Sequence, residues 1–180
     1  MNNNRNIILG VDPGLHTTGY CVLDITTGQA KLLQAGTVHS SKKTLQGRIK
    51  DIFDGIVEVI EIFHPTVLAL EQIYSHYQRP MTGVWMGHAR GVICLAAEQG
   101  KIPVVSYAPT KIKKTLTGSG RAQKDQIQRA VMFELKLSQI PDPPDVADAI
   151  AIAFCHFTEA RQAAKFGNQF VLEAEKLKRS

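Results

Sequence analysis

The sequence predicts a single α/β domain with a mixed, five-stranded sheet flanked by helices. The N-terminal part holds three short apolar or alternating segments joined by short turns, which is typical of an antiparallel meander. Further along, segments with helical spacing alternate with short strand-like segments, which favours parallel strands joined by helices. A chain of 180 residues is long enough for one ordinary domain and too short for two comfortable ones.

The first predicted strand, Ile7–Val11, is an apolar run interrupted only by Gly10. It ends on Asp12, and Pro13-Gly14 then turns the chain. Two further strands are predicted over residues 17–23 and 31–38, and two later ones over residues 67–70 and 104–107. The strand over residues 67–70 is wholly apolar and, like the first, ends on a carboxylate, Glu71.

Helices are predicted where apolar residues recur at intervals of three and four. Their expected ranges are Leu45–Phe63, Thr82–Gln99, Thr110–Leu116, Ala122–Leu137 and Asp145–Thr158. We expect the domain to cover residues 1–158. Residues 159–180 carry mixed charge with some apolar spacing, and we expect them to form a C-terminal tail that is a marginal helix or disordered.

The composition excludes a disordered chain, because 44% of the residues are hydrophobic and 21% are charged. No window holds the run of about 18 apolar residues that a membrane span needs, and the polar N-terminus shows no signal peptide. The three cysteines, Cys21, Cys94 and Cys155, are widely spaced and lie in apolar segments. They indicate buried thiols in a reducing compartment. We therefore expect a cytoplasmic protein without a membrane partner.

The net charge of +5 is unevenly distributed. Lys101–Lys136 contains eight basic and two acidic residues and so carries +6, which leaves −1 for the rest of the chain. A local concentration of positive charge favours a polyanionic partner, such as nucleic acid. A solvated, lysine-rich pair of helices without a partner is an equally acceptable interpretation of the charge alone.

Four carboxylates are candidate site residues: Asp12, Glu71, Asp145 and Asp148. The first two end strands that we expect to be neighbours. The aspartates, three residues apart, lie on one side of the first turn of a helix, where the helix dipole favours anions. Carboxylate oxygens without histidine or cysteine partners suit Mg²⁺ or Mn²⁺. Two such ions can hold the attacking water and the leaving oxygen of a phosphodiester.

Each acid also has a simpler explanation. Asp12 can open a turn by accepting bonds from the amides that follow it, and Glu71 can form a salt bridge at the end of a strand. Asp145 and Asp148 can act as a helix cap and a first-turn acid. All four acids together, beside a segment of charge +6, favour a metal-dependent nuclease site.

Several segments resemble the RuvC family of Holliday-junction resolvases, in order, over roughly Ile7–His156. They are ILGVDPGLHTTGY, LALEQIY, GHARG, TLTGSGRAQK and DPPDVADAIAIA. The resemblance implies a ribonuclease-H-like fold and a homodimer that cuts four-way DNA junctions by paired, symmetric incisions with Mg²⁺. It also implies coupling to a RuvA–RuvB-type branch-migration complex.

The resemblance carries residue roles as well. The four metal-binding and catalytic acids of the family fall on Asp12, Glu71, Asp145 and Asp148, with two ions at each site. The aromatic residue that stacks at the crossover falls on Tyr74, and two lysines that approach the cleaved phosphate fall on Lys113 and Lys124. We also expect Arg79 and Arg121, which lie in polar loops, to contact DNA.

One stretch departs from the family pattern. Residues 75–87 read SHYQRPMTGVWMG, without the lysine that members usually carry there and with Trp85 in addition. Outside the acids, His156 is expected to be a packed or surface residue, and His16 either contacts DNA or fills a turn. Arg90 either holds the active-site loop or pairs with an acid among the helices.

The same residues admit two rival functions. An actin-like or sugar-kinase-like ATPase also carries an Asp-x-Gly near its first strand, but it needs two such domains and a second Gly-rich segment. A junction-binding module without catalysis is expected to lack at least one of the four acids, and all four are present.

Overall fold

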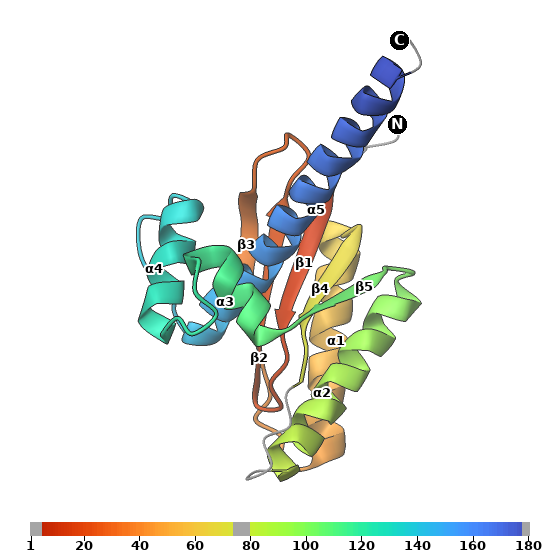
Figure 1. Cartoon of the computed structure of the whole chain (residues 1–180). Coiled ribbons are helices and arrows are strands. Elements are labelled where there is room, and N and C mark those ends of the chain that lie inside the picture. The colour runs from red at the N-terminus through yellow and green to blue at the C-terminus, as the bar shows by residue number, and fades with distance from the viewer. Residues whose placement is uncertain (1–4, 74–79, 178–180) are drawn as a thin grey trace.

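A mixed sheet of five strands forms the centre of the molecule (Figure 1). The computed structural model describes residues 5–73 and 80–177. The strand order is β3-β2-β1-β4-β5, with β1, β2 and β3 antiparallel and β4 and β5 parallel to β1. The strands are β1 (Ile7–Asp12), β2 (Thr17–Asp24), β3 (Lys31–His39), β4 (Val67–Glu71) and β5 (Val104–Tyr107). The predicted fold class, meander included, is confirmed.

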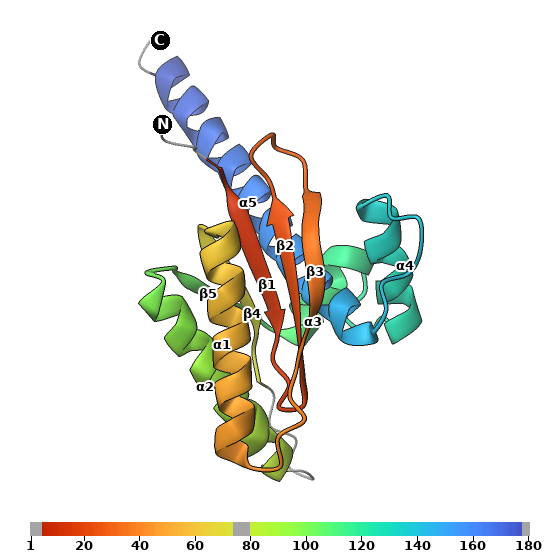
Figure 2. The same cartoon turned by 180° about the vertical axis from the view of Figure 1, so that it is seen from behind.

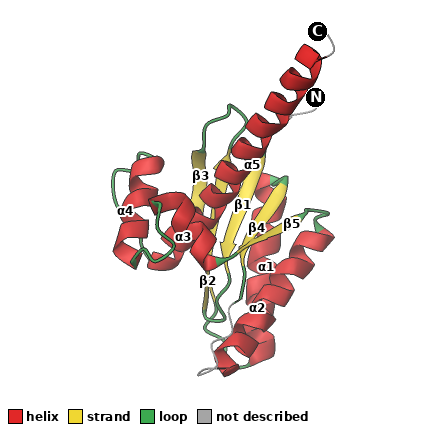
Figure 3. Cartoon of the chain, viewed as in Figure 1, coloured by secondary structure: helices red, strands yellow, loops and turns green. Residues whose placement is uncertain are grey.

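Helices cover both faces of this sheet (Figures 2 and 3). One face carries α1 and α2, and the other carries α5 with α3 and α4 beside it. The helices are α1 (Leu45–Phe63), α2 (Pro80–Gln99), α3 (Pro109–Thr117), α4 (Lys124–Glu134) and α5 (Pro144–Leu177). Among the described residues, no helix is both long and apolar enough to cross a membrane.

Two helices differ from their predicted ranges by more than two residues at one end. Helix α4 is shorter at both ends, because Gln123 forms a capping box with Gln126 and the chain leaves the helix after Glu134. Helix α5 continues without a break through the predicted boundary at residue 158, and its C-terminal half projects past the sheet (Figures 1 and 2). No proline follows Pro144, so nothing in the sequence forces an earlier end. The division into a domain and a tail remains a prediction.

Alternation along β1 and β4 decides which side chains lie on the face covered by α5, because successive side chains of a strand point to opposite faces. Ile7, Leu9 and Val11 pack against α1 and α2, whereas Ile8 packs against α5. Asp12 has the same parity as Ile8. In β4, Val67 and Ala69 likewise lie on the α5 side, and Glu71 follows at the same spacing. Both strand-end carboxylates therefore project from the face that α5 covers.

Helix α5 crosses this face at two glycines. A Cβ atom on Gly10 would lie 2.5 Å from the main-chain oxygen of Ala149 and 2.6 Å from the Cβ of Ala153. A Cβ atom on Gly19 would lie 2.1 Å from the main-chain oxygen of Asp145. All three separations are far below van der Waals contact, so only glycine lets the helix approach this closely.

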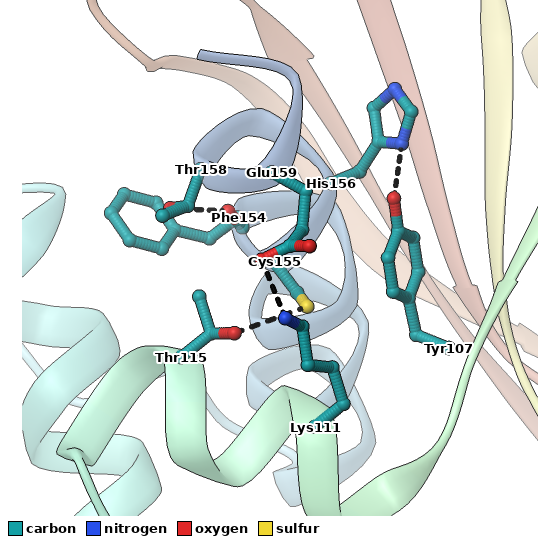
Figure 4. A network of polar contacts seen from close by, with 8 residues as sticks. All are labelled: Tyr107, Lys111, Thr115, Phe154, Cys155, His156, Thr158 and Glu159. Atoms are coloured by element: carbon teal, nitrogen blue, oxygen red, sulfur yellow. Dashed lines mark hydrogen bonds and ion pairs between the residues drawn. The ribbon is translucent and has the colours of Figure 1, made fainter. Parts of the chain in front are cut away.

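Polar contacts fix β5 and α3 against α5 (Figure 4). The Tyr107 hydroxyl and His156 Nδ1 are 2.7 Å apart, and Lys111 Nζ lies 2.8 Å from Glu159 Oε1. Burial lowers the pKa of His156 and raises the pKa of Tyr107 to about 12, so Tyr107 is the donor to a neutral imidazole. His156 is thus a packed residue, as expected.

The cysteines are all free thiols. Cys21 and Cys155 are buried, and Cys94 is partly buried. Cys155 Sγ lies 3.5 Å from Thr115 Oγ1, which adds a further contact between α3 and α5. The prediction of buried thiols without a disulfide frame is confirmed for two of the three positions and partly met at the third.

Candidate active site

Asp12 and Glu71 lie side by side at the carboxyl ends of two parallel strands. Val11 pairs with Leu70 in the register of β1 and β4, so the next residue of each strand is a carboxylate. Ligands of open α/β sheets are typically bound at such strand ends. The predicted neighbourhood of these two acids is therefore confirmed.

The turn after Asp12 is held by a buried threonine. The Thr18 hydroxyl donates to the main-chain oxygen of Gly14 at 2.7 Å and accepts from the Gly14 amide at 3.4 Å. Within the described residues, no hydrogen bond joins the Asp12 side chain to the amides that follow it. Thr18, rather than Asp12, therefore closes this turn.

The charge state of Asp12 reflects its surroundings. Burial, together with the neighbouring charges of Glu71, Asp148 and Asp145, raises the pKa of Asp12 to about 8. Burial also raises the pKa of Glu71, while the hydrogen bond with Asp12 and the charge of Lys113 act in the opposite direction. The pKa of Asp12 therefore depends on the charges of the three other predicted acids.

A pocket of about 280 Å³ opens beside these strand ends. Its charged lining residues are Glu71, Lys113, Lys124 and Asp148. Its apolar lining comes from α3, α4 and α5 (Pro109, Ile112, Ile127, Ala151 and Ile152). Lys124 Nζ lies 3.2 Å from Asp148 Oδ2, so one lysine contacts one predicted acid directly. Four predicted site residues from four elements therefore share one cavity.

The other predicted DNA contacts are placed differently. Arg121 is exposed in the loop between α3 and α4 and is not among the residues that line this pocket. Tyr74 and Arg79 lie outside the described residues.

Arg90 reaches the site from the opposite face of the sheet. Its guanidinium donates to the main-chain oxygen of Glu71 and, at 2.6 Å, to the hydroxyl of Ser106. It therefore joins α2 to the ends of β4 and β5, which favours the first of its two expected roles. Contact with an acidic side chain of the helices is not found for Arg90 among the described residues.

The sequence profile of the family described as "Crossover junction endodeoxyribonuclease RuvC" matches residues 8–156. The chain belongs to the RuvC family. A RuvC of Rhodopirellula baltica is 50% identical over 149 residues, covering 82% of this chain and 84% of that protein. A RuvC of Petrotoga mobilis is 41% identical over 151 residues, covering 83% and 92%.

A solved structure extends the likeness to three dimensions. "T. thermophilus RuvC in complex with Holliday junction substrate" superposes with a TM-score of 0.81 at 31% identity, over 88% of this chain and 96% of that one. The fold is the ribonuclease-H-like fold of the RuvC structures, as the resemblance implied.

Membership of the RuvC family is consistent with the use of a divalent metal ion. The donor set fits such an ion, because four carboxylates without thiolate or imidazole partners suit Mg²⁺. A cation would also stabilise the ionised form of Asp12, which burial and its neighbours disfavour. In the described part of the chain, no three His, Cys, Asp or Glu side chains form a group that could hold a metal ion. The ligand roles of the four acids therefore remain a proposal.

Sequence reasoning about this RuvC chain missed the residues that position the acids. Thr18 closes the turn after Asp12, and Gly10 and Gly19 admit α5. A glycine inside a strand often marks a close backbone approach, so the signal for Gly10 and Gly19 was present. Nothing in the sequence distinguished Thr18 from an ordinary strand threonine.

Proposed function

We propose that the chain is a metal-dependent endonuclease that resolves four-way DNA junctions by paired, symmetric hydrolysis during recombination and repair. Membership of the RuvC family supports the reaction and the substrate. The observation that carries the proposal is the pocket where Glu71 and Asp148 lie with Lys113 and Lys124. Such a pocket combines metal-ligand oxygens with cations suited to a phosphodiester.

We assign separate roles to the acids and the lysines. Asp12, Glu71, Asp145 and Asp148 would hold Mg²⁺, in two-ion sites, with Mn²⁺ as a substitute. Bound there, the metal would activate the attacking water and stabilise the leaving oxygen. Lys113 and Lys124 would hold the phosphate in the pocket and offset the charge that develops on it. Tyr74, Arg79 and Arg121 would contact DNA.

A mobile four-way junction with a broad set of centre sequences tests the proposal. Purified protein and Mg²⁺ should produce paired nicks in strands of like polarity, and a linear duplex of the same sequence should remain intact. Cleavage mapping on randomised centres also reveals any effect of the unusual stretch over residues 75–87. If no centre sequence is cut, the proposed function is wrong.

Lys124 should contribute to cleavage through its charge. We expect Lys124→Gln to lower the single-turnover cleavage rate about 10- to 100-fold, because one cation near the reacting phosphate is lost. Lys124→Arg should recover part of that rate, since it keeps the charge. Lys136→Gln, on the exposed residue that follows α4, is the matched control and should cut normally. Equal rates for Lys124→Gln and the wild type would remove Lys124 from the site.

We propose a homodimer formed through the outer side of α2. Met81, Val84 and Leu95 are exposed there, with residue accessibilities of 57%, 48% and 51%. Gly87 and Gly91 lie between these apolar residues, and a Cβ atom on either glycine would meet nothing within 4 Å. A second helix can therefore approach closely. We extend the proposal to a RuvA–RuvB-type complex as a further partner, on family membership alone.

The dimer proposal predicts that a substitution in the interface converts the dimer in solution to a monomer. Leu95→Glu would place a charge within the interface and should weaken dimerisation at least about 100-fold. Light scattering behind size-exclusion chromatography measures this as a shift to monomer, and paired nicks should become single ones. Ile62→Glu changes a similarly exposed residue of α1 and should leave the dimer intact. A Leu95→Glu protein with unchanged mass would show that α2 is not the interface.

A further inference from the structure

A second pocket lies at the same end of the sheet as Asp12, on the face covered by α1 and α2. Its volume is about 320 Å³, which lies within the range of small-ligand sites. It is lined by Leu15, His16, Arg48, Thr82, Trp85 and Met86. These residues come from the β1–β2 turn, from α1 and from α2. Nothing in the proposed cleavage reaction uses them.

Arg48 is fixed in this pocket by neutral partners. Its Nη1 lies 2.8 Å from His16 Nε2, and its Nε donates to the main-chain oxygen of Lys42 at 2.8 Å. Arginine is always a donor, so His16 accepts on Nε2 and is neutral in this contact. In the described residues, no carboxylate forms an ion pair with Arg48. An oriented guanidinium without a counter-charge is suited to a phosphate.

The surroundings of Arg48 are also basic. Residues 42–50 contain Lys42, Lys43, Arg48 and Lys50 and no acid. Lys50 pairs with Asp54 of α1, which leaves a segment whose free positive charge comes from Lys42, Lys43 and Arg48. Its positive charge favours an anionic occupant over an acidic or apolar protein surface.

Trp85 supplies an aromatic surface next to this cation. The residue is 41% accessible, and the centroids of its ring and the His88 ring are 6.1 Å apart. An indole beside a fixed arginine, with Leu15 and Met86 as apolar walls, matches the way proteins bind single-stranded nucleic acid: bases stack on aromatic rings and cations hold the backbone.

The pocket is also within reach of the proposed cleavage site. His16 follows Asp12 by four residues, so their Cα atoms are at most about 14 Å apart even in a fully extended chain. A DNA strand that leaves the cleavage pocket around the end of β1 would therefore meet the second pocket soon afterwards. The two pockets lie on opposite faces of the sheet and can act on different nucleotides.

We propose that this second pocket binds one unpaired nucleotide of the junction, with its base stacked on Trp85 and its phosphate held by Arg48. The inference rests on the proposed function, because the substrate class is DNA, and it adds a binding site outside the cleavage pocket. It also gives a function to Trp85, which the departure from the family pattern places in α2.

The emission of Trp85 tests the proposal without any substitution, because the chain contains a single tryptophan. The full-length protein is titrated in EDTA with a four-way junction, with a short single-stranded oligonucleotide, and with a linear duplex. We expect saturable quenching by the junction and the oligonucleotide, and little quenching by the duplex. Quenching that follows protein concentration in the absence of DNA would mean that a second copy covers the pocket, which would overturn the proposal.

Binding assays on variants supply the second measurement. Trp85→Ala should weaken junction binding about tenfold, and Trp85→Phe, which keeps an aromatic ring, should bind nearly as the wild type does. Arg48→Gln should weaken binding. It should also reduce the slope of the logarithm of the binding constant against the logarithm of salt concentration by about one. Ile62→Ala, an exposed apolar truncation elsewhere on α1, is the control. Thermal melts establish that each variant is folded.

The outcomes separate the two proposals. A wild type that cuts junctions but shows no quenching, or a folded Trp85→Ala that binds as tightly as the wild type, would overturn the pocket alone. A wild type that cuts no junction would overturn the proposed function, whatever Trp85 reports.

Discussion

Replacing Asp12 with asparagine should lower junction cleavage by at least about 10³-fold and, in the absence of divalent ions, make the folded protein more stable. The loss of cleavage follows from removing a proposed metal ligand whose pKa the three other acids raise. The gain in stability follows because the ionised carboxylate is destabilised by burial and by Glu71, Asp148 and Asp145. Asparagine is neutral, nearly isosteric and able to donate to Glu71.

The stability gain should depend on pH in a defined direction. The pKa of Asp12 is raised from 3.8 to about 8 in the folded state, so between these values the folded protein binds a proton that the unfolded chain does not. The wild type therefore loses stability as the pH rises through this window, and Asp12→Asn removes this loss. At pH 8 in EDTA we expect a gain of about 0.5–2 kcal/mol, or a few degrees in the melting temperature.

Asp148→Asn is the matched control for this prediction. It should also abolish cleavage while junction binding persists, since Asp148 is another proposed ligand. It should not raise the melting temperature, because Asp148 is partly exposed and pairs with Lys124. Full cleavage by either variant would refute the proposed four-acid site. Mg²⁺ should stabilise the wild type and should stabilise neither variant to the same degree.

The sequence was sufficient to predict both strand-end acids and their adjacency. A buried apolar run that ends on a carboxylate is costly to form without a compensating partner, and this happens twice, at Asp12 and Glu71. Strand alternation then places both side chains on the α5 face. These arguments use only neighbours along the chain and one pairing of strands.

Contacts between distant segments were beyond the reach of the sequence. The Lys124–Asp148 pair depends on how α4 packs against α5, and the hydrogen bonds of Arg90 join α2 to the ends of β4 and β5. The full length of α5 was not predicted because residues 159–180 carry mixed charge with only some apolar spacing, which is typical of a marginal helix or a disordered end. Tertiary contacts determine the first two features, whereas the C-terminal half of α5 projects past the sheet and depends on local propensity.

Replacing the glycine at position 19 should lower cleavage strongly, although less than removing a proposed metal ligand does. Gly19 pairs with Asp12 across β1 and β2, and its missing side chain leaves room for the first turn of α5. We expect Gly19→Ala to displace that turn, since the new Cβ would lie 2.1 Å from the main-chain oxygen of Asp145. Overpacking of this kind costs about 1–3 kcal/mol of stability, and a misplaced reacting group costs about 100-fold in rate.

Gly28→Ala is the control that separates this clash from a general loss of glycine. A Cβ atom on Gly28 meets nothing within 4 Å, but its φ of +79° strains any other residue. That variant should lose about 1 kcal/mol of stability and cut junctions at the wild-type rate. Gly19→Ala should instead lose cleavage at temperatures where it is fully folded, as single-turnover rates and thermal melts can show together. Normal cleavage by a folded Gly19→Ala protein would mean that the position of Asp145 relative to Asp12 is not critical, which would contradict a shared metal site.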